Sequence, residues 1–525
     1  MTASRQMVEG APARAGVVLA TLIGVATVAN LNLSVANVAL PDIGRHFDAS
    51  QTAVNAVAVG FSLGLATTVL WLGALGDRYG RKSMLLLGMG LSVPACLLAA
   101  FAPTITVLVF ARILGGVAAG MAFPTTLAII TALWTGPPQT RAIALWSGIG
   151  GAMSAAGPIV AGGLLVRFWW GSVFLITVPL ALVGFVAAWL YVPEHVKEGA
   201  SPVDNIGGVL SVVMISATVI AITIAPSPGQ GTTAIIIGFV ALAALGAFVL
   251  RQRQAASPLY DLKVAARRTF WVAAVAGILV FGALVGALFI GQQYMQNVLG
   301  YSTWEAGLAI IPTAIFTVLA APLSARLIER RGSRDALITG FVAVGLGFGV
   351  MLLLWDQRAS YAVVALAYSL LGIGVGLAGP PASKSLTESV PVTRAGMASA
   401  TADLQRDLGG AVLQAILGAV LTAGYAKAFT TQIADAPSTV SDSVVTQLTK
   451  SFSSAENVST QYPQYADQIV SAARQSFIDG QQAAFAVGIV AMLIGLAVVW
   501  FGFPTKKAEI DLVASFRLSD ESTSA

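Results

Sequence analysis

The chain has 525 residues, of which 56% are hydrophobic and 10% are charged, whereas roughly 25% of the residues of an ordinary soluble protein are charged. This composition excludes a soluble globular protein, and the net charge of +5 does not indicate nucleic-acid binding, because most basic residues lie in short loops between apolar runs. The single cysteine excludes an internal disulfide and a thiolate metal cluster, so we expect an all-α integral membrane protein within the lipid bilayer.

Long apolar runs predict fourteen transmembrane helices, since about 20 apolar residues cross the bilayer once. A polar amino terminus, 1–15, precedes the first run. Six runs form a first bundle within 16–192, namely 16–40, 53–75, 83–102, 105–130, 142–165 and 172–192. Two more runs, 206–225 and 232–250, form an inserted central pair (206–250) around the uncharged segment 226–231. Six others form a second bundle within 270–503, namely 270–293, 304–326, 336–355, 360–380, 395–426 and 483–503.

An even number of spans places both termini on one side of the membrane, and Lys and Arg are far more numerous in the loops on that side. The positive-inside rule therefore makes the termini cytoplasmic, and we expect the polar tail (504–525) to be mobile beyond Lys507. On the outer side, the long segment 427–479 carries apolar residues at helical spacing, which predicts either two amphipathic helices on the outer surface or a loosely ordered loop. Three glutamines end the span 270–293 on this side and are expected at the membrane interface rather than in a cavity: Gln292, Gln293 and Gln296.

The ten residues from Gly73 to Lys82 place one acid and three bases in a glycine-rich turn between two apolar runs, which indicates a cytoplasmic hairpin. They resemble the loop signature of the major facilitator superfamily of transporters, and a degenerate copy with the same spacing at 325–334 indicates an internal repeat. The resemblance implies a gate motif in which Asp77 and Arg78 contact the other half of the molecule and hold the outward-open state. The alternative is a positive-inside anchor without a gating role. The motif residues are Gly73, Asp77, Arg78, Gly80 and Arg81.

The first span carries Asn30, Ser34 and Asn37 on one helical face. Polar groups are costly in hydrocarbon, so this face should meet other helices or a wet cavity, and interhelical hydrogen bonding without a substrate role is an alternative. The segment 31–41 resembles the first-helix signature of the fourteen-helix drug:proton antiporter branch of the superfamily, which usually has an acid in the place of Asn32. The resemblance therefore implies that the first helix lacks its usual proton-binding group.

Arg112 lies inside the span 105–130, where a charged guanidinium is costly unless it is paired or hydrated. It matches the buried-arginine motif of the superfamily, which implies a part in proton movement near the binding cavity; a structural role is the alternative. In the next span, glycines and a proline predict a kinked helix that packs closely against its neighbours. These residues are similar to the superfamily's antiporter motif, which implies export: Gly157, Pro158, Gly162 and Gly163.

The span 395–426 contains two acids, Asp403 and Asp407, which share a helical face close to the predicted midplane of the bilayer. Two nearby carboxylates in a poorly hydrated site resist simultaneous ionisation, which suits a proton acceptor. We therefore expect Asp403, or as a second candidate Asp407, to take over the carrier role that Asn32 cannot perform. The alternative is an ion pair between Asp403 and Arg406 that only fixes the helix.

The sequence predicts a major facilitator fold of two six-helix bundles, and the resemblance implies a proton-coupled multidrug efflux transporter of the cell inner (plasma) membrane. Such a protein exports lipophilic or cationic small molecules by alternating access, which can give antibiotic resistance, and we expect it to act as a monomer. The alternatives are an exporter of lipid or cell-envelope precursors, a proton-independent transporter and a non-transporting membrane sensor. We expect neither enzymatic activity nor a cofactor, because the two histidines, His46 and His195, lie in loops and no nucleophile elbow, metal-ligand spacing or phosphate-binding loop is present.

Overall fold

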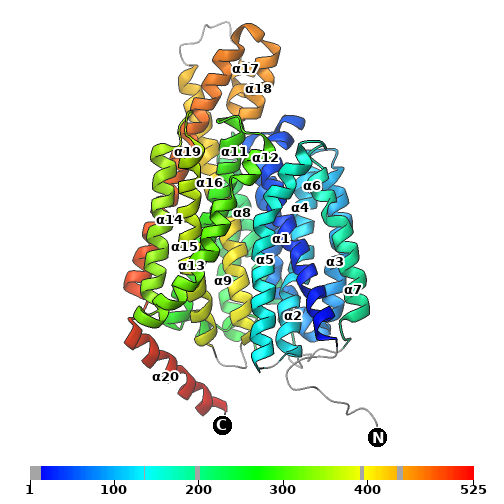
Figure 1. The fold of residues 1–525 in the computed structure, drawn as a ribbon, viewed down its shortest axis with the longest axis vertical. Coiled ribbons are helices and arrows are strands. Elements are labelled where there is room, and N and C mark those ends of the chain that lie inside the picture. Colours follow the sequence, from blue (N-terminus) through cyan, green and yellow to red (C-terminus); the bar gives the residue numbers. More distant parts are fainter. Residues whose placement is uncertain (1–13, 135, 195–201, 391–394, 434–441, 525) are drawn as a thin grey trace.

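The computed structural model describes residues 14–134, 136–194, 202–390, 395–433 and 442–524, and every regular element within these ranges is a helix (Figure 1). Thirteen helical segments of the described residues are long and apolar enough to cross a membrane. A further helix of 30 residues, α5 (Gly136–Leu165), runs alongside them and is about 45 Å long at 1.5 Å per residue. The protein is therefore a multi-pass membrane protein, and the thirteen segments and α5 together match the fourteen predicted spans.

The first half of the molecule contains the helices that precede the inserted pair. They are α1 (Ala15–His46), α2 (Gln51–Tyr79), α3 (Arg81–Ala100), α4 (Ile105–Leu133), α5, α6 (Ser172–Leu175) and α7 (Thr177–Tyr191). The Ser50 side chain caps α2 by accepting a hydrogen bond from the Ala53 backbone N–H at 3.2 Å. Between α2 and α3 the chain turns at Gly80, whose φ of 113° strongly favours glycine.

The second half repeats this arrangement. It contains α10 (Leu262–Ala265), α11 (Arg268–Asn297), α12 (Thr303–Leu308), α13 (Ile311–Arg331), α14 (Ser333–Leu354), α15 (Tyr361–Glu388), α16 (Ala395–Gln432) and α19 (Ala466–Gly502). Gly332, with a φ of 96°, occupies the turn between α13 and α14 as Gly80 occupies the turn between α2 and α3. The two turns agree with the internal repeat inferred from the sequence.

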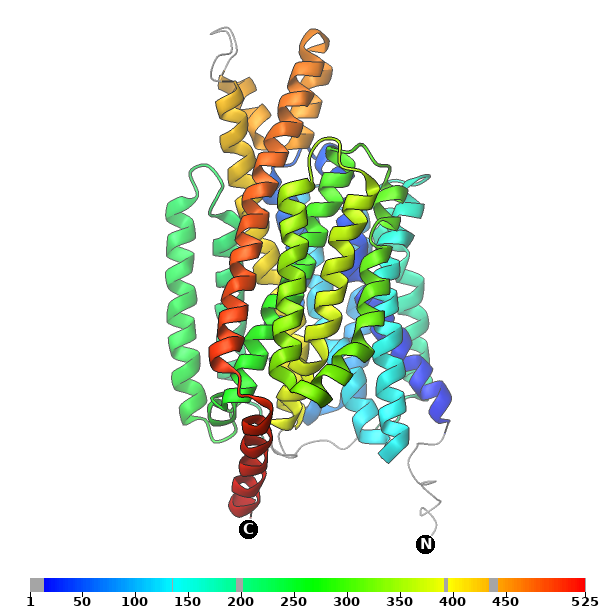
Figure 2. The same cartoon turned by 60° about the vertical axis from the view of Figure 1, so that its left-hand side comes forward.

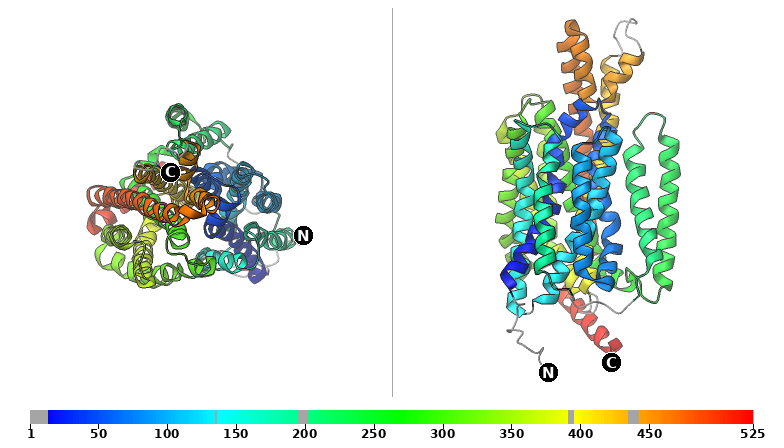
Figure 3. Two further views of the ribbon diagram at one scale, coloured as in Figure 1. Left: turned by 90° about the horizontal axis from the view of Figure 1, so that it is seen from above. Right: turned by 90° about the vertical axis from the view of Figure 1, so that its right-hand side faces the viewer.

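The inserted pair consists of α8 (Asn205–Ile224) and α9 (Gly231–Gln254), which stand at the edge of the molecule (Figure 3). Asp204 caps α8 by accepting from the Gly207 N–H at 3.1 Å, and it also pairs with Arg251 of α9 at 2.9 Å. Burial alone would raise the pKa of Asp204, but the bonds from Gly207, Arg251 and Gln252 outweigh burial and hold that pKa below its ordinary value. The ionised Asp204 therefore fastens α9 to α8 at one end of the pair.

We call the end of the bundle that carries the carboxy-terminal helix the inner face and the opposite end the outer face, following the predicted orientation (Figure 1). At the outer face, α16 and α19 continue beyond the predicted spans, and α17 (Asp442–Lys450), α18 (Phe452–Gln461) and η2 (Pro463–Tyr465) pack against them. These three short elements, with 425–432 of α16 and 466–480 of α19, form what we call the outer cap (Figure 2).

The outer cap has an apolar centre despite its polar sequence. Phe452 of α18 packs against Phe477 of α19 with ring centroids 6.4 Å apart, and the Tyr425 hydroxyl donates to the Leu448 carbonyl at 3.1 Å. Of the two predicted arrangements for 427–479, the described residues adopt the helical one. The helices rise above the outer face rather than lie flat on it, because α16 and α19 extend far enough to support them (Figures 1 and 2).

The tail is helical, as α20 (Lys506–Ser524), and it touches the bundle near its start, while the predicted mobility beyond Lys507 stays a prediction. Glu509 is 6% exposed and accepts hydrogen bonds from the Ser333 backbone N–H at 3.2 Å and the Ser333 hydroxyl at 2.6 Å. The first N–H groups of α14 have no partner within that helix, and Glu509 supplies one of the missing acceptors. This contact joins the start of the tail helix to the second half.

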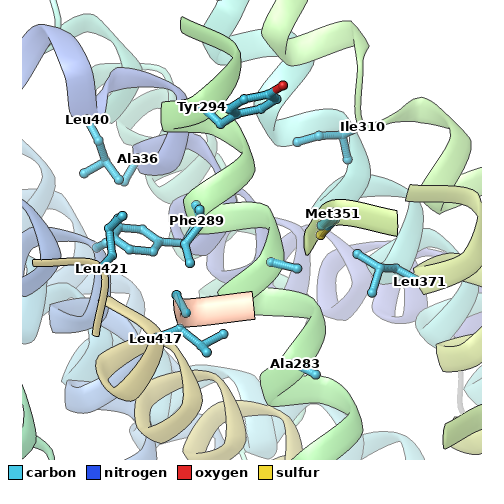
Figure 4. Close-up of a cluster of buried hydrophobic side chains, with 14 of the residues drawn as sticks. Ala36, Leu40, Ala283, Phe289, Tyr294, Ile310, Met351, Leu371, Leu417 and Leu421 are labelled. Carbon is cyan, nitrogen blue, oxygen red and sulfur yellow. The ribbon is translucent and has the colours of Figure 1, made fainter. Parts of the chain in front are cut away.

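A buried apolar cluster joins the two halves near the outer face. Phe289 of α11 points toward Leu421 of α16, with Leu417 close by, and Ala36 and Leu40 of α1 lie next to them (Figure 4). All five side chains are 0% exposed. The halves are therefore in tight apolar contact on this side.

Candidate functional site

Asp403, Arg406 and Asp407 form a charged cluster inside α16. The Arg406 guanidinium lies 3.4 Å from a carboxylate oxygen of Asp403 and 3.9 Å from one of Asp407. The two acids are 6% and 4% exposed, and Asp407 Oδ2 has no hydrogen-bond partner. One cation cannot balance two ionised carboxylates, and a buried unbalanced charge is costly. The ion pair predicted between Asp403 and Arg406 and the pair of acids predicted for Asp403 and Asp407 therefore occur together in one cluster.

The charged cluster lies where α16 meets the first half. The Arg406 guanidinium carbon is 5.0 Å from the ring centroid of Phe123 in α4, close enough for a cation–π contact. Leu404, which directly follows Asp403, packs against the buried apolar cluster of the first half. A change in the charge of this cluster would therefore act on a contact between the halves.

Buried amide atoms without hydrogen-bond partners lie on α16 and on the neighbouring α2. Gln405 Oε1, Gln414 Nε2 and both side-chain polar atoms of Asn55 on α2 are buried and make no hydrogen bond. Gly418 of α16 makes room for Asn55, because a Cβ atom at that position would lie 2.4 Å from the Asn55 amide. Unsatisfied buried polar groups are rare and need an explanation such as water or a ligand. The sequence analysis did not single out these amides, although polar residues within apolar runs were a usable signal.

Arg112 is buried at 2% exposure and is held by backbone carbonyls and aromatic rings. Its Nη1 donates to the Asn32 carbonyl at 2.8 Å and its Nε to the Val57 carbonyl at 3.4 Å. The Phe61 and Phe174 ring centroids lie 4.9 Å and 5.4 Å from its guanidinium carbon. No acid in the described part of the chain forms an ion pair with Arg112, and its Nη2 has no partner. The charge is therefore stabilised by dipoles and π faces alone.

The Asn32 side chain points away from this guanidinium toward a thiol. Asn32 Nδ2 donates to Cys96 Sγ at 3.3 Å, and the Thr177 hydroxyl lies 3.2 Å from the same sulfur. Burial raises the cost of leaving any of these polar groups unpaired, so the three side chains satisfy one another. Asn32 thus has a structural contact in the place where an acid was expected from the resemblance.

On the predicted polar face of α1, two side chains bond to backbone carbonyls of their own helix. Asn30 Nδ2 donates to the Ala26 carbonyl at 2.9 Å, and the Ser34 hydroxyl donates to the Asn30 carbonyl at 3.0 Å. Ser34 also lies against Gly157 of α5, where a Cβ atom would be 1.9 Å from the hydroxyl. Asn37 is half-buried. Ser34 therefore packs against a neighbouring helix while its hydroxyl bonds within α1, and both roles stated for this face stay predictions.

The glycines of α5 allow it to touch the other half. Three close contacts join α5 to α12: Pro158 with Gly307, Gly162 with Thr303, and Gly163 with Trp304. A Cβ atom at position 162 would lie 2.5 Å from the Thr303 carbonyl oxygen, a distance that excludes a side chain without movement. The close packing expected from these residues is present, and it lies across the outer part of the boundary between the halves.

The three glutamines of α11 are buried between the halves, so their predicted place at the membrane interface is wrong. Gln293 accepts a hydrogen bond from Gln51 of α2 at 2.8 Å, and Gln296 donates to the Val38 carbonyl of α1 at 3.0 Å. Gln292 is 0% exposed. The reason is that α11 continues to Asn297 and turns these side chains toward the first half. With the contacts between α5 and α12, they close the outer side of the molecule.

Two side chains of the gate motif at the inner face, Asp77 and Arg81, bond within the first half. Asp77 pairs with Arg81 at 2.8 Å, and Arg81 Nη1 donates to the Ala128 carbonyl of α4 at 3.0 Å. Gly80 makes the turn described above, whereas a Cβ atom at Gly73 would meet nothing within 4 Å. The predicted contact of Asp77 and Arg78 with the second half belongs to an outward-open state, whereas the outer side is closed here, so that contact stays a prediction.

Comparison with known proteins places the chain among transporters. The family described as Major Facilitator Superfamily matches residues 22–413. The multidrug efflux pump LfrA of Mycolicibacterium smegmatis is 32% identical over 494 residues, which cover 94% of this chain and 97% of the pump. The multidrug resistance protein Stp of Mycobacterium tuberculosis is 30% identical, with 90% of this chain and 89% of that protein covered. The tetracenomycin C resistance and export protein of Streptomyces glaucescens is 28% identical, with 94% and 92% covered.

Solved structures share the fold at low sequence identity. A bacterial homolog of the human lysosomal transporter Spinster, in an inward-facing and unoccupied conformation, aligns with a TM-score of 0.65 at 15% identity and covers 94% of this chain and 97% of its own. The peptide transporter POT in complex with sulfate aligns with a TM-score of 0.62 at 13% identity, with 92% of this chain and 94% of its own covered. These likenesses confirm the predicted fold class.

Proposed function

The chain belongs to the Major Facilitator Superfamily, and from that premise we propose that it is a proton-coupled exporter of lipophilic or cationic small molecules that works by alternating access. The relatives described as efflux pumps and resistance proteins cover nearly the whole chain at 28–32% identity, which supports export of drug-like compounds. Those names give no coupling ion, and among them only the tetracenomycin C export protein of Streptomyces glaucescens names a cargo. In this chain the charged cluster on α16 bears on both the coupling ion and the cargo.

The observation that carries the proposal is that two buried carboxylates share one guanidinium. Repulsion between the carboxylates and the cost of burial both favour a state in which one of them holds a proton. Asp407 is the better candidate for that proton, because its Oδ2 lacks a partner and its distance to Arg406 is longer than that of Asp403. The sequence analysis favoured Asp403 first, and the proposal reverses that order.

Arg406 would couple proton release to the movement of the two halves. When both acids are ionised, they draw the guanidinium toward α16, and when one is protonated, Arg406 is freer to interact with Phe123 of the first half. A cationic cargo would compete with the proton for the second carboxylate, which is the basis of exchange transport. Asn32 cannot titrate, so the first half contributes no carrier at that position.

One feature favours the second candidate, export of lipids or lipid-like precursors. An apolar groove of about 570 Å³ lies between the inserted pair and α16, and its walls include Phe239, Leu408 and Val412. Thr218 is its single hydroxyl-bearing wall residue, and that hydroxyl is already bonded to the Met214 carbonyl at 2.8 Å. Such a groove suits an alkyl chain rather than a charged group.

The test is proton flux in liposomes that contain the purified protein. Lipophilic cations are added on one side, and proton movement is followed with a trapped pH-sensitive dye in the wild type and in the double variant Asp403→Asn/Asp407→Asn. We expect cargo-induced proton movement in the wild type, its loss in the double variant, and its retention in the control variant Asp467→Asn, whose side chain is exposed at the outer face.

Two other results would decide against parts of this proposal. Cargo movement without proton movement in the wild type would make the protein a proton-independent transporter. If labelled phospholipids move while cations do not, the lipid-export candidate replaces the drug-export proposal.

A further inference from the structure

The outer cap belongs to the second half by chain connection, but it binds the first half at one short segment. That segment is 42–49, the end of α1 and the turn into α2. Ser451 donates to the Ala49 carbonyl at 2.8 Å, and Arg45 binds Glu456 of α18 at 2.7 Å. The cap therefore bridges the boundary between the halves at its outermost point.

Asp48 is the centre of this bridge. Its Oδ2 pairs with Lys450 Nζ at 2.7 Å, and its Oδ1 accepts from the Ser454 hydroxyl at 2.9 Å and from Asn457 Nδ2 at 3.5 Å. Lys450 Nζ also donates to the Asp48 carbonyl. Asp48 has a φ of 44°, a left-handed conformation that Asp and Asn tolerate better than most residues. Three side chains of the cap thus make four interactions with one residue of the first half.

The surrounding surface is shaped for close approach. A Cβ atom at Gly44 would lie 2.8 Å from the Ser453 hydroxyl oxygen, so the cap helix could not approach α1 as closely if position 44 carried a side chain. Ser451 and Ser454 are each 1% exposed, although serine is usually found at the surface. Burial of these hydroxyls is stable because both donate to the segment around Asp48.

We propose that the outer cap is a latch on the outer gate: Asp48 holds Lys450, Ser454 and Asn457 when the outer side is closed and must release them when it opens. The inference rests on the alternating access proposed above, because separation of the halves at the outer face would move α1 away from α16 and α19. The latch stabilises the closed state without touching cargo, which makes Asp48 and Lys450 positioning residues for the gate.

Charge and hydrogen bonding give this contact more strength than an ordinary surface ion pair. An exposed pair contributes little because water competes for both partners, but a carboxylate that accepts several charged and neutral donors is held more firmly. Burial would raise the pKa of Asp48, and the hydrogen bonds from Lys450, Ser454 and Asn457 together with the Lys450 charge outweigh burial and lower it. Asp48 therefore stays ionised across the physiological pH range.

The experiment measures the outer opening directly in purified protein reconstituted in lipid nanodiscs. Spin labels are attached to cysteines at two exposed outer positions, Arg167→Cys in the first half and Arg358→Cys in the second. The native Cys96 is buried at 3% exposure and should not react. Distance distributions between the labels are then compared for the latch variants Asp48→Asn and Lys450→Met, their combination, and a control.

Asp48→Asn keeps the side chain's shape and its tolerance of the left-handed conformation, so it removes the charge alone. The control is Lys384→Met, which breaks an ion pair of the same length, 2.7 Å, between Lys384 and Glu388 within α15. We expect each latch variant to raise the ratio of the long-distance to the short-distance population by roughly five- to thirty-fold. The combined variant should raise this ratio no further than either single variant does, because both substitutions act on one contact.

Unchanged distributions in both latch variants, or an equal shift in Lys384→Met, would overturn the proposal. A fully additive double variant would also overturn it, since independent effects are not those of one latch. If Asp48→Asn does not fold, Ser454→Ala removes one bond to Asp48 without changing charge and should give a smaller shift in the same direction, and no shift would count against the latch. The distance measurement needs no cargo, so its result can be interpreted even if the transport proposal fails.

Discussion

At the scale of single residues, the balance of buried charge distinguishes the two halves. Arg112 in the first half has backbone carbonyls and aromatic rings as partners, while Arg406 in the second half has two carboxylates. In the described residues, the first arrangement contains no acid that pairs with the guanidinium, and the nearby thiol of Cys96 is bonded to Asn32 and Thr177. The second has two acids and one base. The proton chemistry proposed for this protein therefore belongs to α16.

Arg112→Lys should destabilise the first half although it preserves the charge. A lysine cannot donate to the carbonyls of Asn32 and Val57 together and lie flat between two rings as the guanidinium does. Loss of these charged hydrogen bonds should lower the free energy of unfolding by about 2 kcal/mol, seen as a lower midpoint in thermal unfolding of the purified protein. Arg358→Lys, at an exposed outer loop, is the matched control. Equal midpoints for the two variants would mean that Arg112 is not held by these contacts.

At the scale of helices, the sequence predicted the transmembrane spans and the turns between them well, because the chain passes there between lipid and water. The spans were predictable because each needs an apolar stretch of a fixed length, and the turns at Gly80 and Gly332 were predictable from a local motif. The outer cap and α20 were harder, because their stability comes from contacts between distant segments, such as Glu509 with Ser333. Hydropathy does not report such contacts.

The candidate site likewise contains residues that the sequence reveals and contacts between distant segments that it does not reveal. Asp403 and Asp407 were found because acids in an apolar run are conspicuous. The contact of Arg406 with Phe123, and the bond of Gln51 with Gln293, required knowledge of how the two halves meet. Pairings across such a boundary have no signature in the spacing of residues along one helix.

Gly162→Ala should weaken the close contact between α5 and α12 at the outer face. The added Cβ would lie 2.5 Å from the Thr303 carbonyl, and overpacking of this kind costs about 1–3 kcal/mol. The matched control is Gly246→Ala in α9, where a Cβ would meet nothing within 4 Å and the better helix propensity of alanine should be neutral or slightly stabilising. The spin labels at positions 167 and 358 would report a larger long-distance population in Gly162→Ala than in the control. The same population in both variants would contradict the importance of this contact.

Glu509→Ala should loosen the first turn of α14. It removes a capping acceptor and a negative charge beside a helix amino terminus, which together should cost about 1 kcal/mol. Hydrogen exchange of the backbone amides at 333–337 should become faster, while amides at the start of α3, which α20 does not cap, keep their wild-type rate. Glu509→Gln retains an acceptor, so its exchange rate at 333–337 should lie between that of the wild type and that of Glu509→Ala. If exchange at 333–337 does not change, α20 rests on the bundle without stabilising it.

At the scale of the whole molecule, α16 connects the features that would have to act together. Its 38 residues span about 57 Å at 1.5 Å per residue. It carries the charged cluster at one level, Gly418 against Asn55 of α2 at the next, and the base of the outer cap at its end. A tilt of this helix caused by protonation of Asp407 would therefore be transmitted to the outer latch, since the cap moves with α16 as one packed unit.

Asp407→Asn should separate exchange of cargo from uphill export. An amide resembles the protonated acid, so the variant can still move between states with cargo, but it cannot release the proton that makes export run against a gradient. In liposomes, export driven by a pH difference should fall by at least roughly tenfold, the effect of about 1.4 kcal/mol on an equilibrium, while counterflow of labelled cargo against unlabelled cargo continues at close to the wild-type rate. Asp403→Asn should reduce both activities together, because it removes the closer partner of Arg406. If Asp407→Asn also loses both activities equally, its role is structural, and if it loses neither, the proton is carried elsewhere.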